Sequence, residues 1–152
     1  MDNAREYLTK TVPRLIELLG SEDQPKFGIM TAQHMLEHLI WVTKSSVKDY
    51  GAPPESLTDK QMGFKNFILK GAHFEHRPSD KTRADLEPPR LGNLEEASKK
   101  IPEAIDRLYA HNDDHVFYNP MMGILTFEEM ETFHASHFKY HLEKQFGLSL
   151  EK

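Results

Sequence analysis

The spacing of hydrophobic residues is the feature that most restricts the fold of this chain. Apolar residues recur at intervals of three and four in four long segments and in a weaker fifth, which is typical of amphipathic helices. No segment alternates convincingly between polar and apolar residues, as a half-buried strand would. We therefore expect an all-α protein built as a four-helix bundle.

Capping residues set the limits of the expected helices. Side chains that can accept a hydrogen bond from the first helical turn open four segments, at Thr31, Thr58, Asn93 and Thr126. The expected helices are residues 3–19, 31–50, 58–71, 94–110 and 126–147, with 58–71 the weaker one. Pro13 predicts a kink or a restart within the first helix.

Two connections lie between these helices. Residues 51–93 form a long connection between the second and third main helices, and its part 72–92 holds three prolines and little periodicity, so we expect it to cover part of the bundle. Residues 111–125 are expected to be a loop with a turn at Asn119-Pro120. A chain of 152 residues suits one domain, residues 1–152.

Composition excludes several classes of function. The net charge is −5 and no basic stripe is visible in the sequence, which argues against a nucleic-acid partner. The chain has no cysteine, so a bound metal would need nitrogen or oxygen ligands. The charged N-terminus lacks the apolar core of a signal peptide, and no run approaches the length of a membrane span. We expect a cytoplasmic protein without membrane contact.

Histidines are concentrated in the last expected helix, in the stretch FHASHFKYHLEKQF. A helical projection places His134, His137 and His141 on the arc that also carries Phe133 and Phe138 and faces the core. His137 and His141 are four residues apart, so both rings leave one face of the helix and could reach one metal ion at about 2.1 Å. A buried imidazole without a partner would cost on the order of 1–3 kcal/mol.

A second pair with the same spacing, His34 and His38, lies at the margin of the core face of helix 31–50. Such a margin can line a cleft between helices. Two interpretations stay open for the histidine pairs: they bind a metal ion, or they are core and surface histidines that hydrogen-bond within the protein.

Three sharper motifs fit less well. Residues 34–38 match H-x-x-E-H, a metallopeptidase pattern with Glu37 as the base, but such proteases are much larger. Residues 131–134 match a single E-x-x-H, whereas a di-iron bundle needs two copies. A haem would need two opposed histidines, and a cluster of three or more exceeds that requirement.

Four stretches, TAQHMLEHLI, LEPPRLGNLEEA, YNPMMGILTFEEMETFH and HFKYHLEKQF, resemble the DinB-like (YfiT-type) superfamily of metal-dependent enzymes, in an uncharacterised branch with a proline-rich middle segment. The resemblance implies a four-helix bundle with a long connection between the second and third main helices. It also implies a divalent metal ion, most often nickel or zinc, on His38, His137 and His141. The branch has a glutamine three residues after the second of these last-helix histidines, whereas Gln145 follows His141 by four.

The leading hypothesis is a metal-dependent hydrolase or thiol-type transferase that acts on a small-molecule substrate. Four further residues are candidates to hydrogen-bond the ligands or to contact the substrate: His34, Glu37, His134 and Gln145. The alternative is a non-enzymatic helical binding or stress-response module whose histidines are structural. A homodimer through exposed helix faces would fit either hypothesis.

Overall fold

The computed structural model describes residues 3–151. Its elements, in chain order, are α1 (Ala4–Glu6), the π-helical η1 (Tyr7–Thr11), α2 (Val12–Glu17), α3 (Ala32–Ser46), α4 (Asp59–Leu69), the 3-10 turn η2 (Arg83–Asp85), α5 (Leu94–Tyr109), β1 (Val116–Asn119), β2 (Gly123–Thr126), α6 (Phe127–Lys139) and the π-helical η3 (Tyr140–Gln145).

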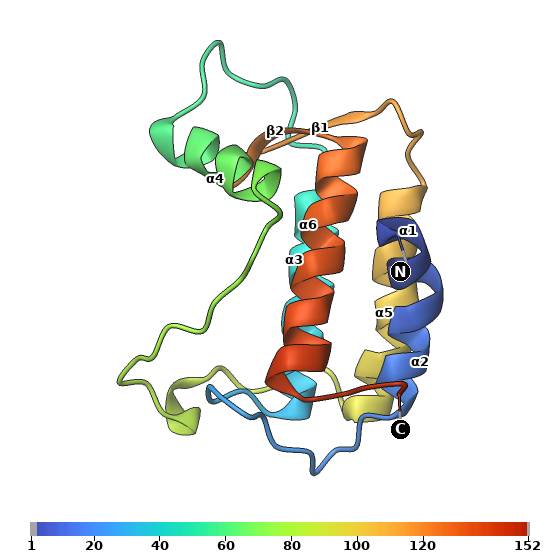
Figure 1. The fold of residues 1–152 in the computed structure, drawn as a ribbon. Helices are drawn as coiled ribbons and strands as arrows, with labels where there is room; N and C mark the ends of the chain where they lie inside the picture. The colour runs from blue at the N-terminus through green and yellow to red at the C-terminus, as the bar shows by residue number, and fades with distance from the viewer. Residues whose placement is uncertain (1–2, 152) are drawn as a thin grey trace.

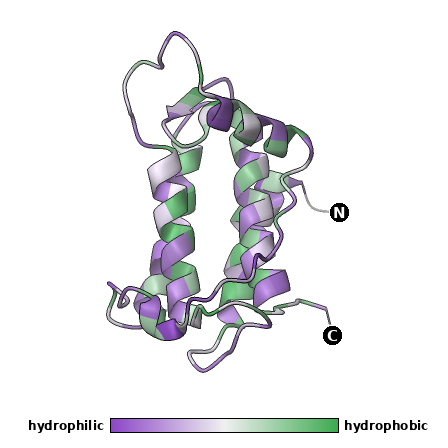
Figure 2. Ribbon diagram, turned by 90° about the vertical axis from the view of Figure 1, so that its left-hand side faces the viewer, coloured by the Kyte–Doolittle hydropathy of each residue, from purple (hydrophilic) through white to green (hydrophobic). Residues whose placement is uncertain are grey.

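Four helical rods contribute to the buried core and run side by side (Figure 1). They are the continuous helix α1–η1–α2, then α3, α5, and the continuous helix α6–η3. Green and purple residues alternate around the rods in Figure 2, as expected for helices with one face in the core. The largest fully buried side chains come from all four rods and from β2: Phe127, Phe138, Leu8, Leu15, Met35, Leu36, Leu39, Ile101, Leu108, Leu125, Met130 and Leu142.

The expectation of an all-α four-helix bundle is wrong, because the chain also forms a β-hairpin. β1 and β2 pair antiparallel, with Val116 opposite Thr126 and Asn119 opposite Gly123. Residues 111–125 are therefore not simply a loop, although the expected turn at Asn119-Pro120 is there. Each strand has only four residues, which is too short for a two-residue alternation to stand out from the surrounding polar sequence.

Helix α4 is a fifth helix that lies against the hairpin rather than inside the bundle (Figure 1). The Gln61 side chain donates to the carbonyl of Pro120 over 2.9 Å. Gly123 has a φ of 82°, and a Cβ on it would lie 3.0 Å from Cβ of Gln61, so glycine allows this close approach. Together α4 and the hairpin cap one end of the bundle.

Pro13 does not interrupt the first helix. The amide of Val12 donates to the carbonyl of Tyr7, five residues back, so the turn just before the proline is wider than an α-helical turn. A wider turn gives the ring of Pro13 room against the preceding carbonyls, which would otherwise clash with it. The second expected helix is shorter than predicted, since α3 ends at Ser46 instead of residue 50.

The long connection returns along the bundle to reach α5, as Figure 1 shows. Its last part is attached to the start of α3 by side chains of that helix. Within residues 3–151, no helix is both long enough and apolar enough to cross a membrane.

Candidate metal centre

Three histidines from two antiparallel helices meet at one level of the bundle. His38 lies in the second turn of α3, His137 near the end of α6, and His141 one turn further on in η3. Because α3 and α6 run in opposite directions (Figure 1), the first turns of one helix lie beside the last turns of the other. The expected inward orientation of the last-helix histidines is observed, with His137 and His141 buried and His38 half-buried.

The imidazole nitrogens converge closely. Nε2 of His137 lies 3.1 Å from Nε2 of His38 and 3.1 Å from Nε2 of His141. One nitrogen from each ring can be chosen so that all three lie within 4.8 Å of one another. Two nitrogens bound to one ion at about 2.1 Å would lie about 3.0 Å apart at a right angle and about 3.4 Å apart at the tetrahedral angle. The spacing therefore fits a shared metal ion.

Gln145 fixes the protonation of His141. Its side-chain nitrogen donates to the carbonyl of Phe27 over 3.4 Å, which directs its oxygen toward Nδ1 of His141 at 2.7 Å. Nδ1 must then carry the hydrogen, and in a neutral ring Nε2 keeps its lone pair. That lone pair points into the cluster, which is the arrangement that a metal ligand requires. The glutamine thus reaches His141 despite its shifted spacing in the sequence.

Burial keeps the three rings neutral. Removal from water lowers the pKa of His38 to about 4, and the neighbouring His141 adds a smaller repulsion. Burial is also the main cause that lowers the pKa of His137, followed by His141, His38 and His134. The pKa of His141 is lowered by burial against the opposing bond to Gln145. Neutral imidazole is the form that binds metal ions.

Aromatic rings enclose the cluster. The ring of His137 stacks on Phe133, with centroids 5.4 Å apart, and lies 5.1 Å from the ring of Phe74. Tyr140 lies 5.0 Å from His141 and 5.6 Å from Phe74. Phe74 was missed by the sequence analysis, because it belongs to the non-periodic connection and no spacing rule places it at the site.

His134 is fully buried but is not one of the three converging rings. Its Nε2 lies 2.7 Å from Oγ of Ser46, and that hydroxyl donates to the carbonyl of Thr43. The hydroxyl therefore accepts from Nε2–H of His134. Burial lowers the pKa of His134 to about 3. Within the part of the chain that the structure describes, Nδ1 of His134 and Nδ1 of His137 have no hydrogen-bond partner.

The side chains of His34 and Glu37 form hydrogen bonds with the long connection and not with the three-histidine cluster. Nε2 of His34 lies 2.9 Å from the carbonyl of Glu87. The carboxylate of Glu37 accepts from the amides of Arg90 over 2.7 Å and Leu91 over 3.2 Å. Of the four residues expected around the site, only Gln145 bonds one of the three histidines.

The fold and the site define a helical-bundle protein in which α3 and the α6–η3 helix bring three neutral histidines together. A protein-family model matches residues 8–146, and the family is described as "Protein of unknown function (DUF1569)". The match covers most of the chain, so the protein belongs to this family. No curated protein and no solved structure matches the chain significantly.

Proposed function

We propose that the protein binds one divalent metal ion through His38, His137 and His141. The observation that carries this proposal is the convergence of three imidazole nitrogens, with two Nε2–Nε2 separations of 3.1 Å. Gln145 supports it by leaving the lone pair of His141 Nε2 free for a ligand bond. The resemblance of HFKYHLEKQF to the last-helix motif of DinB-like enzymes points to the same ligands.

The ligand set favours nickel or zinc. Imidazole nitrogen suits these ions, whereas magnesium and calcium prefer oxygen ligands. Three protein ligands leave at least one position for water or substrate, as in catalytic zinc sites. Such a site would supply a bound water of lowered pKa or a position for a thiolate. We therefore propose a metal-dependent hydrolase or thiol-type transferase that acts on a small molecule.

The surrounding residues have defined tasks in this proposal. Phe74, Phe133 and Tyr140 limit the access of water to the cluster, which strengthens electrostatic interactions inside it. Gln145 orients His141, and the stacked ring of Phe133 holds the plane of His137.

The test is elemental analysis of untagged protein, followed by reconstitution with nickel and with zinc. We expect close to one ion per chain in the wild type and loss of that ion in His137→Ala. His73→Ala is the matched control, because His73 is exposed and lies outside the cluster. Wild-type protein that neither contains nor takes up either ion would exclude the proposal and favour the non-enzymatic binding module.

A further inference from the structure

A groove lies on the other flank of α3. It runs between α3, α5 and the end of the long connection at Arg90 and Leu91, and its volume is about 490 Å³. None of the three clustered histidines lines it. The groove is therefore a separate feature of the molecule, and the proposed metal ion does not account for it.

The groove is strongly basic. Five cationic side chains line it: Lys44, Lys48, Arg90, Lys100 and Arg107. Glu37 is the one carboxylate in the lining, and its oxygens already accept hydrogen bonds from the amides of Arg90 and Leu91. The net charge of the chain is −5, so the positive charge of the groove is opposite in sign to the net charge of the molecule. The sequence did not reveal it because the cations come from three separate segments.

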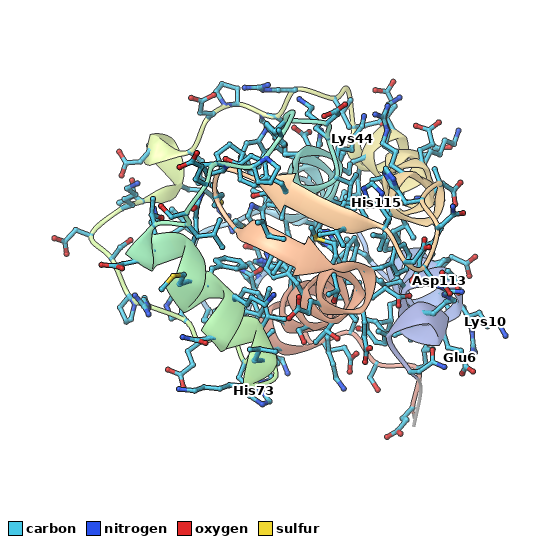
Figure 3. All side chains as sticks on the ribbon, turned by 90° about the horizontal axis from the view of Figure 1, so that it is seen from above. Glu6, Lys10, Lys44, His73, Asp113 and His115 are labelled. Carbon is cyan, nitrogen blue, oxygen red and sulfur yellow. The ribbon has the colours of Figure 1, made fainter. Side chains whose placement is uncertain are left out.

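Most of these cations are available to a ligand. Among residues 3–151, Lys44, Lys48 and Arg107 form no ion pair, whereas Lys100 pairs with Glu103 over 3.6 Å. Arg90 has a pair at 3.9 Å to Glu87, but the two side chains are 82% and 87% exposed, and such pairs contribute little. Figure 3 shows Lys44 on the outer side of the bundle, near α5. An anion in the groove would therefore meet several uncompensated charges.

Trp41 adds a flat aromatic surface to the same groove. It lies three residues before Lys44, so these two side chains share one face of α3, and Lys48 follows just beyond the end of that helix. Trp41 is 56% exposed, although it is a large apolar residue. An exposed indole beside cations suits a planar ring that carries negative charge, through stacking on the ring and ion pairs to its substituents.

The wall of the groove is held in place. Glu37 accepts from two successive backbone amides at Arg90 and Leu91, and the Gln33 side chain donates to the carbonyl of Leu91 over 2.8 Å. This segment therefore forms a fixed side opposite α5. A volume of about 490 Å³ falls in the range of pockets that hold single small ligands, about 300–1,000 Å³.

We propose that this groove binds a nucleotide, a phosphorylated small molecule with a planar ring. Trp41 stacks on the ring, and Lys44, Lys48 and Arg107 bind the phosphate groups. The proposal does not depend on the metal centre, because the two sites share no residue.

Trp41 is the only tryptophan of the chain, so its fluorescence reports directly on the groove. We would titrate the wild-type protein with ADP, pyrophosphate, adenosine and a short single-stranded oligonucleotide. The salt concentration would be about 0.1 M, where charges more than about 10 Å apart are screened. The test variant is Lys44→Glu/Lys48→Glu. The control is Lys10→Glu/Lys60→Glu, which changes the net charge equally on η1 and α4, away from the groove.

We expect saturable quenching by ADP that is weaker by at least about tenfold in the test variant, because two ion pairs to phosphate are replaced by repulsion. The control variant should bind as the wild type does, and pyrophosphate and adenosine should each bind more weakly than ADP. Absence of saturable ADP binding, or an equal loss in the control, would overturn the proposal. Pyrophosphate binding as tight as ADP binding would show that stacking of the planar ring on Trp41 does not contribute to the affinity. Tighter binding of the oligonucleotide would identify a macromolecular partner instead.

Discussion

At the scale of single residues, the position of the ring hydrogen on His141 distinguishes a metal ligand from a histidine that only packs in the core. His141 has a defined hydrogen position because Gln145 accepts from Nδ1 at 2.7 Å. The amide orientation is itself set by the bond to the carbonyl of Phe27. No similar partner is found for Nδ1 of the buried His137 within the described residues. Of His137 and His141, it is therefore His141 that a hydrogen bond from outside the cluster orients.

This asymmetry predicts the effect of changing Gln145. Gln145→Leu removes the acceptor for His141 Nδ1–H, so we expect the metal affinity to fall by about 10–100-fold, the usual effect of losing such a partner. Gln145→Glu keeps an acceptor at the same place and should bind at least as tightly as the wild type. Competition with a chromophoric chelator measures both. Equal affinities for the wild type and Gln145→Leu would contradict the assigned tautomer.

The buried His134 predicts a pH dependence of stability in the metal-free protein. Its pKa in the folded state is about 3, against about 6.5 in an unfolded chain. The unfolded state thus binds more protons between these values, and stability is lost as the pH falls through this range. His134→Leu should reduce the change of unfolding free energy with pH by up to about 1.4 kcal/mol per pH unit. Urea denaturation from pH 7 to 4 measures this pH dependence, and the same dependence in the variant as in the wild type would contradict the prediction.

At the scale of elements, local signals predicted the helices well. The four N-caps Thr31, Thr58, Asn93 and Thr126 each accept the expected bond from the first helical turn. The hairpin and the π-turns were missed because their causes are not local. Short strands are stabilised by their partner and by α4, and hydrophobic periodicity does not distinguish a π-turn from an α-turn.

Two glycines should respond in opposite directions to alanine. Gly147 ends η3 with a φ of 67°, and an added Cβ would lie 2.5 Å from Cε of Lys26. Gly147→Ala should therefore cost about 1–2 kcal/mol. Gly63 lies inside α4, and an added Cβ there meets nothing within 4 Å, so Gly63→Ala should stabilise the protein by about 0.5–1 kcal/mol. Chemical denaturation of both variants tests the pair, and a stabilising Gly147→Ala would contradict it.

At the scale of the whole molecule, the site depends on contacts that no local pattern encodes. His137 and His141 could be paired from their spacing alone. The addition of His38 rested on a family resemblance, and its position follows from the antiparallel packing of α3 against α6. The contacts of His34 and Glu37 could not be predicted for the same reason, since the connection that they bind is distant in sequence. From the sequence alone, a polar side chain at the margin of the core can be assigned equally well to a metal centre or to a hydrogen bond with a distant segment of the chain.

The attachment of the connection predicts the effect of removing Glu37. Glu37→Ala leaves the amides of Arg90 and Leu91 without their acceptor, so residues 83–91 should open more often while the three-histidine cluster stays intact. Trypsin should then cleave after Arg83 and Arg90 several times faster than in the wild type, because local opening limits cleavage of folded segments. Glu17→Ala, an exposed change on α2, is the control and should not alter cleavage. Metal content should remain at the wild-type level. A loss of metal in Glu37→Ala without faster cleavage would instead indicate that Glu37 contributes to the metal centre.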